Sequence, residues 1–305
     1  MAVEAGRSIA SGPSHMPIVS LIAPRGQLDP ALVTSLQTAW GGGDALWLAP
    51  DEAAEFPVGA APSNLDAVRA DVAGMSVDVN VLPAEGRRKR LLIADMDSTM
   101  IGQECIDELA DEAGVGDRVA GITARAMNGE LDFEEALIER VGLLKGLPVT
   151  VIDRVLETRI TLAAGGPELV ATMRANGARA ALVSGGFVQF TGRIAERLGF
   201  DEHRANTLLE AEGALTGDVA RPILGRDAKV TALSEITAAM GVTPAEAVAV
   251  GDGANDLGMI EAAGMGVALH AKPSVAAQAP VRVDHGDLTA LLFLQGYSRD
   301  DFVSP

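Results

Sequence analysis

Two acidic residues, Asp95 and Asp97, stand two positions apart where the apolar run LLIAD ends. Side chains two apart in an extended segment point in the same direction, so both carboxylates can reach one site. The pair also has an ordinary interpretation, in which both acids are solvated and Ser98 and Thr99 close an Asx-type turn. Its chemistry therefore depends on what other segments bring to the same place.

Three more polar segments could complete such a site. Residues 184–186, the sequence SGG, end a second apolar run, and residues 252–256, the sequence DGAND, follow a third. Glycines let backbone N–H groups approach an anion, and Lys229 in a polar helical segment offers a cation. The hard carboxylate oxygens of Asp95 and Asp252 suit Mg²⁺, which commonly bridges to a substrate phosphate. Together these residues predict phosphoryl transfer with Asp95 as the attacking group.

Two other interpretations of the same loops fail. A calcium loop starting at Asp95 needs glycine at its sixth position and glutamate at its twelfth, where this chain has Met100 and Ile106. A dinucleotide-binding fingerprint needs a third glycine where this chain has Asp256. Neither site is expected.

Apolar runs of the kind found in buried parallel strands recur along the chain, with helical patterns between them. The helix expected from Pro167 to Asn176 has proline at its start and Gly177 after its end, as well-bounded helices do. Strands that alternate with helices predict an α/β fold with a doubly wound, Rossmann-like parallel sheet, whose functional residues lie at the carboxyl ends of the strands. The runs span residues 91–95, 178–184, 247–252, 266–269 and 281–284.

More than 80 residues separate the first two runs, far more than an ordinary strand-to-helix connection needs. Apolar positions in this stretch recur with helical spacing, and Asp132 with Glu135 resembles a capping box. We expect a helical cap inserted at about residues 103–166, lying over the active end of the sheet like a lid.

The first 85 residues predict a small α+β domain that precedes a core domain at residues 86–305, with residues 1–15 left aside. Apolar runs begin at Ile18 and at Ala45, and valines alternate from Val77 to Val81. Helices are expected from about Leu28 to Trp40 and after Asn64. The pattern is similar to that of ferredoxin-like ACT modules, which bind amino acids. A packing or dimerisation element without a ligand is the alternative.

The composition narrows the class of protein. A net charge of −18 repels polyanions, so we expect no nucleic-acid partner, and no apolar run approaches the roughly 20 residues of a membrane span. The lone cysteine, Cys105, cannot form an internal disulfide, which favours a reducing compartment, and we expect a cytoplasmic protein.

The basic run from Arg87 to Arg90 predicts a solvated strand entry or linker.

The motifs DxDST, SGG, a lysine and GDGxND, in this order between about Leu91 and Leu292, resemble those of the haloacid dehalogenase superfamily of phosphohydrolases. Longer stretches resemble its phosphoserine phosphatase family: DMDSTMIGQECIDELADEAG, ITARAMNGELDFEEALIERVGLLKGL, LVSGGF, GALTGDV and AVGDGANDLGMIEAAG. The resemblance implies magnesium-dependent hydrolysis of O-phosphoserine to serine and phosphate, the last step of serine biosynthesis, through an aspartyl-phosphate intermediate on Asp95.

The resemblance also implies roles for the matching acids. Asp95 would be the nucleophile and a metal ligand. Asp97 would be the general acid and base, and would bind Mg²⁺ through its backbone carbonyl. Asp252 would complete the metal ligands of the protein, and Asp256 would orient Lys229 or a metal-bound water from behind.

The remaining matches would hold the substrate. Ser184, Gly185, Lys229 and Asn255 would bind the phosphate. Glu104 would meet the substrate ammonium, while Arg140 would bind its carboxylate through a planar two-bond fork. Taken singly, Glu104 and Arg140 are more ordinary as solvated helix residues. The pair Met127 and Phe133 would line the cap side of the pocket or belong to plain core.

Two other functions remain open. One is a related phosphatase or phosphotransferase acting on another small phosphoester, such as phosphohomoserine or a sugar phosphate. The other is a receiver-like signalling domain that accepts a phosphoryl group without turnover, although the long insertion and the GDGAND loop argue against it. The expected partner is a small-molecule substrate, and a homodimer is a further open expectation.

Overall fold

The computed structural model describes residues 16–127 and 130–304, so the first 15 residues, which the fold prediction leaves aside, lie outside it. The chain divides into two compact units, residues 1–87 and residues 88–305. Within the described ranges, no helix is long and apolar enough to cross a membrane.

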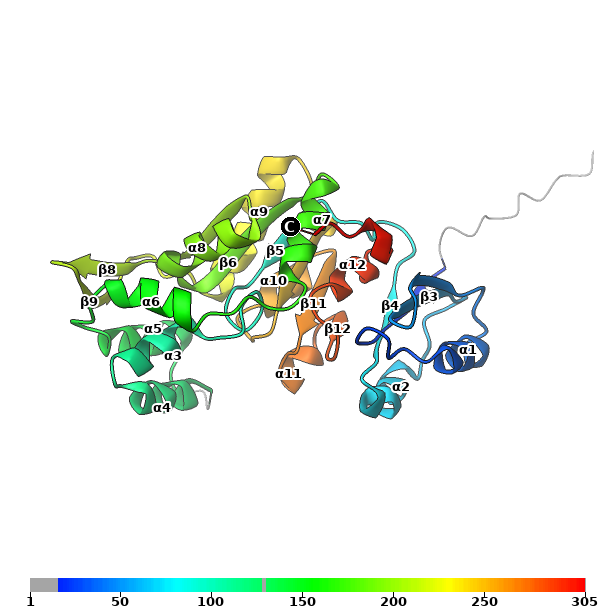
Figure 1. Cartoon of the computed structure of the whole chain (residues 1–305), viewed down its shortest axis with the longest axis horizontal. Coiled ribbons are helices and arrows are strands. Elements are labelled where there is room, and N and C mark those ends of the chain that lie inside the picture. Colours follow the sequence, from blue (N-terminus) through cyan, green and yellow to red (C-terminus); the bar gives the residue numbers. More distant parts are fainter. Residues whose placement is uncertain (1–15, 128–129, 305) are drawn as a thin grey trace, which may run out of the picture. The chain divides into compact units, whose positions relative to one another are not determined.

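The N-terminal unit is an antiparallel sheet with two helices packed on one face (Figure 1). Its elements are β1 (Ile18–Ile22), α1 (Pro30–Ala39), β2 (Leu46–Ala49), β3 (Ala53–Pro57), α2 (Leu65–Val72) and β4 (Asp78–Leu82). The order βαββαβ, with strands arranged β2-β3-β1-β4, is the ferredoxin-like arrangement. Alternate residues of β1, such as Val19 and Leu21, pack with Phe56 in the core beneath the helices.

Two details of this unit differ from the sequence prediction. Helix α1 begins at Pro30 and not at Leu28, because the Asp29 carboxylate accepts a hydrogen bond from Ala31 N (2.8 Å) and so caps the helix. Strand β3, with the sequence AAEFP, was not predicted, because Glu55 interrupts its apolar pattern and Pro57 ends it. Strand β3 nevertheless pairs with β1 on one side and β2 on the other.

The larger unit is built on a parallel sheet of six strands within the described residues, which confirms the predicted α/β fold class. The strands are β5 (Leu91–Ala94), β6 (Arg179–Phe187), β7 (Glu202–Asn206), β10 (Ala247–Gly251), β11 (Met265–Leu269) and β12 (Val281–Val283). They lie in the order β12-β11-β10-β5-β6-β7, so the strand order reverses between β5 and β10. In such sheets, ligands bind outside the carboxyl ends of the strands at this switch point.

Strand β5 lies at the centre of the sheet, and all four of its residues are fully buried. Leu91 and Ile93 pack with Leu233 and Ile236 of α9 on one face. Burial on both faces explains why the strand is apolar without alternation.

Strand β7 was not predicted, because its sequence EHRAN is polar and it lies at the edge of the sheet. The helices of this layer are α7 (Gly166–Ala175), α8 (Val188–Leu198), α9 (Arg226–Met240), α10 (Leu257–Ala262), α11 (Pro273–Ala276) and α12 (Ala290–Leu294).

Four of the five described helices between β5 and β6 form the cap (Figure 1). They are α3 (Cys105–Glu112), α4 (Gly116–Met127), α5 (Phe133–Gly142) and α6 (Thr150–Thr158). The predicted capping box is present at α5, where Glu135 N donates to Asp132 Oδ1 (2.8 Å) and Asp132 N donates to Glu135 Oε2 (3.2 Å). The segments by which the chain enters and leaves the cap lie side by side, and Gln103 Nε2 of one donates to Thr161 Oγ1 of the other (2.9 Å).

A β-hairpin also packs against the cap. It consists of β8 (Leu208–Ala211) and β9 (Ala214–Val219), and β9 lies in the stretch GALTGDV that resembles the family. Gly146 N donates to Leu215 O (2.8 Å) and Val149 N donates to Gly213 O (3.0 Å), so the hairpin supports the connection between α5 and α6. The hairpin thus joins two parts of the cap region that lie about 70 residues apart in the chain.

The basic run departs in part from the predicted solvated strand entry or linker, because Arg88 and Arg90 are exposed just before β5 whereas Lys89 is buried. Lys89 is only 7% exposed, and its Nζ donates to Ala245 O (2.8 Å). Arg87 forms a two-bond ion pair with the buried Glu55 (2.7 and 2.9 Å). The guanidinium of Arg88 lies 4.1 Å from the centre of the Tyr297 ring. Each of these cations therefore has a defined partner that lies far away in the sequence.

Close packing around β11 generates a stability prediction. A Cβ on Gly266 would lie 1.9 Å from Ile260 O, a backbone atom that cannot move without disturbing α10. We expect Gly266→Ala to lower the free energy of unfolding by about 1–3 kcal/mol. Gly121→Ala is the matched control, because Gly121 lies inside α4 with open space around it, and alanine there should stabilise the helix by up to about 1 kcal/mol. Thermal melting of both variants checks this, and equal melting temperatures would contradict it.

Candidate active site

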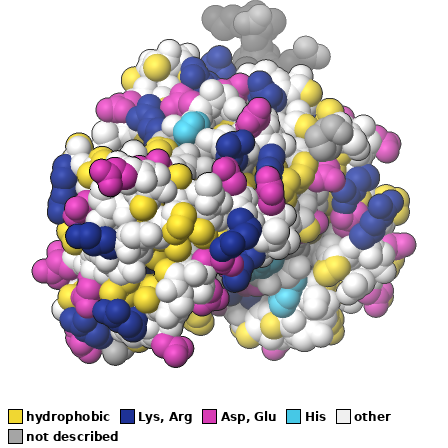
Figure 2. Space-filling model, turned by 60° about the vertical axis from the view of Figure 1, so that its left-hand side comes forward, with side chains coloured by type: hydrophobic (Ala, Val, Ile, Leu, Met, Phe, Trp, Pro, Cys, Tyr) yellow, Lys and Arg dark blue, Asp and Glu magenta, His cyan; other side chains and the backbone are white. Residues whose placement is uncertain are grey.

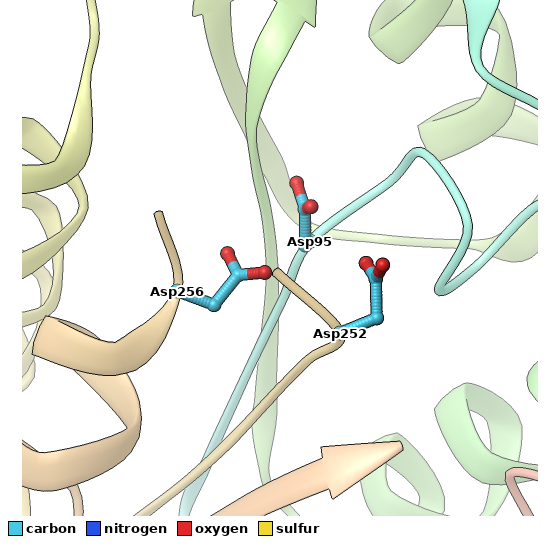
Figure 3. Close-up of side chains that lie close together, drawn as sticks. All are labelled: Asp95, Asp252 and Asp256. Carbon is cyan, nitrogen blue, oxygen red and sulfur yellow. The ribbon is translucent and has the colours of Figure 1, made fainter. Parts of the chain in front are cut away.

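The carboxyl ends of β5 and β10 bring the predicted acids together at the switch point. Asp95 follows β5 and donates its backbone N–H to Val250 O (3.0 Å), while Asp252 follows β10. Asp256, which precedes α10, approaches from the other side (Figure 3). One carboxylate oxygen from each of these three residues lies within 4.8 Å of the others. The convergence that the sequence predicted is therefore present.

Lys229 projects from α9 into this group and is fully buried. Its Nζ lies 2.7 Å from Asp95 Oδ1 and 2.5 Å from Asp256 Oδ1. Burial alone would lower the pKa of the Lys229 ammonium, but the two carboxylates raise it above its usual value. Lys229 is therefore charged, and it fixes one oxygen of Asp95 in place. Asp256 is itself held by Gly253 N (3.0 Å), so it orients Lys229 from behind.

The same group fits a divalent metal ion. Three carboxylates and one ammonium leave two negative charges, and all candidate donors are hard oxygens. Burial, followed by the charge of Asp256, raises the pKa of Asp95 well above its usual value and that of Asp252 to about 6. Asp95 Oδ1 lacks a hydrogen bond of good geometry although Lys229 Nζ is near. Buried acids with uncompensated charge are what a cation would stabilise.

Asp97 occupies a different environment from Asp95. Its Oδ1 accepts a hydrogen bond from Cys105 N at the start of α3 (3.0 Å), and its Oδ2 lies 3.5 Å from Ser184 Oγ. Burial, and then the negative charge of Glu104, raise the pKa of Asp97 to about 7. Asp97 can therefore hold a proton near neutral pH. A Cβ on Gly186 would lie 2.6 Å from Asp97 Oδ2, so the glycine leaves the room that this carboxylate occupies.

A cavity of about 450 Å³ opens over these groups. Ser184, Gly185 and Asn255 all line it, as the sequence predicted, whereas Lys229 lies behind its wall. Ser184 Oγ accepts a hydrogen bond from Gly186 N (2.9 Å) and donates a long one to Asp97 Oδ2 (3.5 Å). The cavity wall therefore offers a hydroxyl and an amide side chain close to Asp95, as an anion site requires.

The same cavity is also lined by the predicted substrate-recognition residues. Glu104 and Arg140 both line it, from the start of α3 and the end of α5. Glu104 Oε1 accepts a hydrogen bond from Ser98 Oγ (2.7 Å), and Arg140 Nε donates to Ala136 O (3.2 Å). Burial lowers the pKa of Arg140, although Asp107 and Glu104 oppose this effect. The structure thus brings one acid and one guanidinium into the cavity that Asp95 lines, with Glu104 close enough to Asp97 to raise its pKa.

Several polar residues of this site were not among the predicted site residues, and Asp107 and Thr99 illustrate why. Asp107, one turn after Glu104 on α3, also lines the cavity, and spacing of three residues on a helix could have indicated it. Thr99 is buried and donates to Asp252 Oδ1 (3.2 Å), a contact across 153 residues that no local pattern reveals. Phe133 lines the cavity as expected, but the side chain of Met127 lies outside the described residues.

Removal of the Lys229 charge tests the electrostatics of the site. We expect Lys229→Met, measured with a chelator present, to lower the free energy of unfolding by about 3–5 kcal/mol, because Asp95 and Asp256 lose their common partner. Adding Asp256→Asn should restore part of this loss. The deficit should also shrink as the pH falls, because the stranded carboxylates become neutral.

Chemical denaturation between pH 5 and pH 8 provides the measurement. The control is Lys145→Met, which removes an equal charge from an exposed position. A deficit that is the same for both lysine variants would mean that the buried ammonium does not hold the acids together.

Comparisons with known proteins agree with this geometry. Residues 92–261 match the family of haloacid dehalogenase-like hydrolases. A phosphoserine phosphatase of Archaeoglobus fulgidus is 47% identical over 207 residues, which cover 67% of this chain but only 60% of that protein. A phosphoserine phosphatase of Streptococcus thermophilus is 47% identical over 200 residues, which cover 66% of this chain and 93% of that protein.

Solved structures give the same result. A haloacid dehalogenase family hydrolase from Salmonella enterica serovar Typhi has a TM-score of 0.83 and 30% identity, and the match covers 92% of this chain and 98% of that one. A phospho-aspartyl intermediate analogue of phosphoserine phosphatase has a TM-score of 0.63 and 41% identity, and covers 68% of this chain and 98% of that one. The chain belongs to the haloacid dehalogenase-like hydrolase family.

Proposed function

We propose that this protein is a magnesium-dependent phosphoserine phosphatase that hydrolyses O-phosphoserine to serine and phosphate. The observation that carries the proposal is one cavity that is lined by several aspartates, with Lys229 buried behind its wall, and that is also lined by Glu104 and Arg140. O-Phosphoserine has a phosphate at one end and an ammonium and a carboxylate at the other. The names of the relatives support the same substrate.

Asp95 is the nucleophile in the proposed mechanism. Lys229 holds Oδ1, which leaves Oδ2 to attack the phosphorus in line with the departing seryl oxygen. The phosphorus–oxygen bond to serine breaks as the bond to Asp95 forms, and phospho-Asp95 results. The solved analogue of a phospho-aspartyl intermediate supports this step.

Asp97 moves the protons. With a pKa of about 7, its carboxyl group can give a proton to the seryl oxygen as serine leaves. The resulting carboxylate then takes a proton from the water that hydrolyses phospho-Asp95. Ser184, Gly185 and Asn255 hold the phosphoryl oxygens during both steps, and Lys229 offsets the charge that they develop.

Asp95 and Asp252 are the side chains that would hold Mg²⁺, with the backbone carbonyl of Asp97 as the third ligand that the family resemblance implies. The bound ion would neutralise the two excess negative charges of the site and polarise a phosphoryl oxygen. Asp256 touches Lys229 and Gly253 N, so we assign it to orienting these groups.

Several other expectations drawn from the sequence remain predictions. Phosphohomoserine or a sugar phosphate is the alternative substrate, and a sugar phosphate would give Glu104 and Arg140 no ammonium or carboxylate to bind. A receiver-like acceptor is a poorer fit to a cavity with substrate-recognition residues. The domain division at residues 85 and 86, an ACT-like role of the N-terminal unit, a homodimer and a cytoplasmic location also remain predictions.

The two aspartates of the DxDST motif generate a kinetic prediction. Asp95→Asn should abolish phosphate release, because the amide is a poor nucleophile. Asp97→Asn should slow formation of the phosphoenzyme by about 10²–10⁴-fold, the usual contribution of general acid catalysis. A single-turnover assay with O-phosphoserine and Mg²⁺ measures both, and Asp71→Asn on the exposed face of α2 is the control. Full activity in either active-site variant would refute the assignment.

The recognition residues generate a prediction about substrate choice. Arg140→Met should lower kcat/KM for O-phosphoserine by about 10–100-fold, because charge-assisted hydrogen bonds to the carboxylate are worth about 1.5–3 kcal/mol. The same change should have little effect on phosphoethanolamine, which lacks the carboxylate. Glu104→Gln should weaken the reaction of both substrates, because both carry the ammonium. Equal losses on both substrates for Arg140→Met would show that Arg140 does not bind the carboxylate.

A further inference from the structure

A second cavity, of about 620 Å³, lies next to the first and shares part of its wall. Residues from the cap and from the core line both cavities, so the two adjoin; the first is called the inner cavity and the second the vestibule. The shared residues are Thr123, Phe133, Arg140, Ala254, Asn255 and Lys272.

The charge of this vestibule differs from that of the protein. Arg140, Arg226 and Lys272 line it, and no acidic side chain occurs among the described residues of its wall. The whole chain has 42 acidic against 24 basic residues, and both signs are interspersed on the face shown in Figure 2. The inner cavity is lined by several acids, including Asp95, Asp97 and Asp252. A wall with three cations and no described acid is therefore unusual for this molecule.

The three cations come from separate segments, so they are not neighbours on one helix. Arg140 lies near the end of α5 in the cap, whereas Arg226 is the first residue of α9 in the core. Lys272 lies in the loop after β11, the strand next to β10 in the sheet. Among the described residues, Arg226 has no ion-pair partner, although most arginines of the chain have one. The Arg226 charge is therefore not neutralised by a neighbouring acid.

The backbone fixes the segments that carry Arg226 and Lys272. His270 adopts a left-handed conformation (φ 46°), with its N–H donating to Val283 O and its Nε2 donating to Gly286 O (2.8 Å each). These bonds hold the loop two residues before Lys272. Gly258 lets α10 pack closely against the helix that Arg226 begins, because a Cβ there would lie 2.7 Å from Val230 Cγ2 of α9. Both cations are exposed at the wall of the cavity.

We propose that Arg226 and Lys272 form an anion-capture site that draws the phosphorylated substrate from solvent into the inner cavity. This role rests on the proposed phosphatase function and extends it to substrate entry. A dianionic phosphate approaching a protein of charge −18 is repelled at long range. Local cations beside the inner cavity reverse that repulsion over roughly 10 Å, the screening length at 0.1 M salt. Neither residue touches the reacting atoms, so both are positioning residues.

Kinetics at two salt concentrations test the proposal. At low ionic strength, the double variant Arg226→Met/Lys272→Met should lower kcat/KM for O-phosphoserine about 10-fold, mainly through KM, with little change in kcat. Near 0.5 M salt the difference should fall below about 2-fold, because screening removes the advantage of the wild type. The conservative variant Arg226→Lys/Lys272→Arg should keep the wild-type kcat/KM, since the role depends on charge and not on shape.

A matched control and a binding measurement separate this proposal from the phosphatase function. Arg118→Met removes a cation from an exposed position of α4 that lines neither cavity, and it should leave kcat/KM unchanged. Calorimetry with inorganic phosphate should give about 10-fold weaker binding to the double variant than to the wild type at low salt. Equal affinities, or phosphate binding to neither protein, would overturn the capture site whether or not the wild type hydrolyses O-phosphoserine. A wild type that binds phosphate but releases none from O-phosphoserine would overturn the phosphatase function alone.

Discussion

The buried ion pairs of Lys229 with Asp95 and Asp256 are the interaction on which the site depends. A fully buried ammonium is stable only beside carboxylates, and a fully buried carboxylate needs a cation. One lysine shared by two acids holds Asp95 in place but leaves the group negatively charged. That remaining charge is what makes the site suitable for a divalent ion and, with it, for a phosphate. The buried ion pairs therefore both hold the site together and leave it the negative charge that a divalent ion would bind.

The strand order brings these residues together. Asp95 and Asp252 lie 157 positions apart, yet β5 and β10 are neighbours in the sheet and both acids follow their carboxyl ends. Inserting the cap directly after β5 brings Glu104 and Arg140 into the cavity at this edge. The cavity is therefore lined by acids that the sheet positions and by residues that the cap supplies. Such a division lets one chemistry serve different substrates within a family.

The sequence predicted what depends on local pattern. Apolar runs located the central strands, and the acids that follow them located the switch point. The polar edge strand β7 and the strand β3 gave no such signal, because their stability comes from pairing and not from periodicity. Burial of Lys89 and Lys229 was equally hidden, since their partners lie 156, 134 and 27 residues away. The roles of the individual site residues stay predictions until they are tested.

The central claim is that Asp95 receives the phosphoryl group while its carboxylate is held by Lys229. Rapid acid quenching during turnover of O-phosphoserine with Mg²⁺, followed by peptide mass spectrometry, tests it most directly. We expect a phosphoryl group on the peptide that contains Asp95. Base treatment should remove it, because an acyl phosphate is base-labile. A phosphoryl group on Ser98 or Ser184, or turnover with no labelled residue, would contradict it.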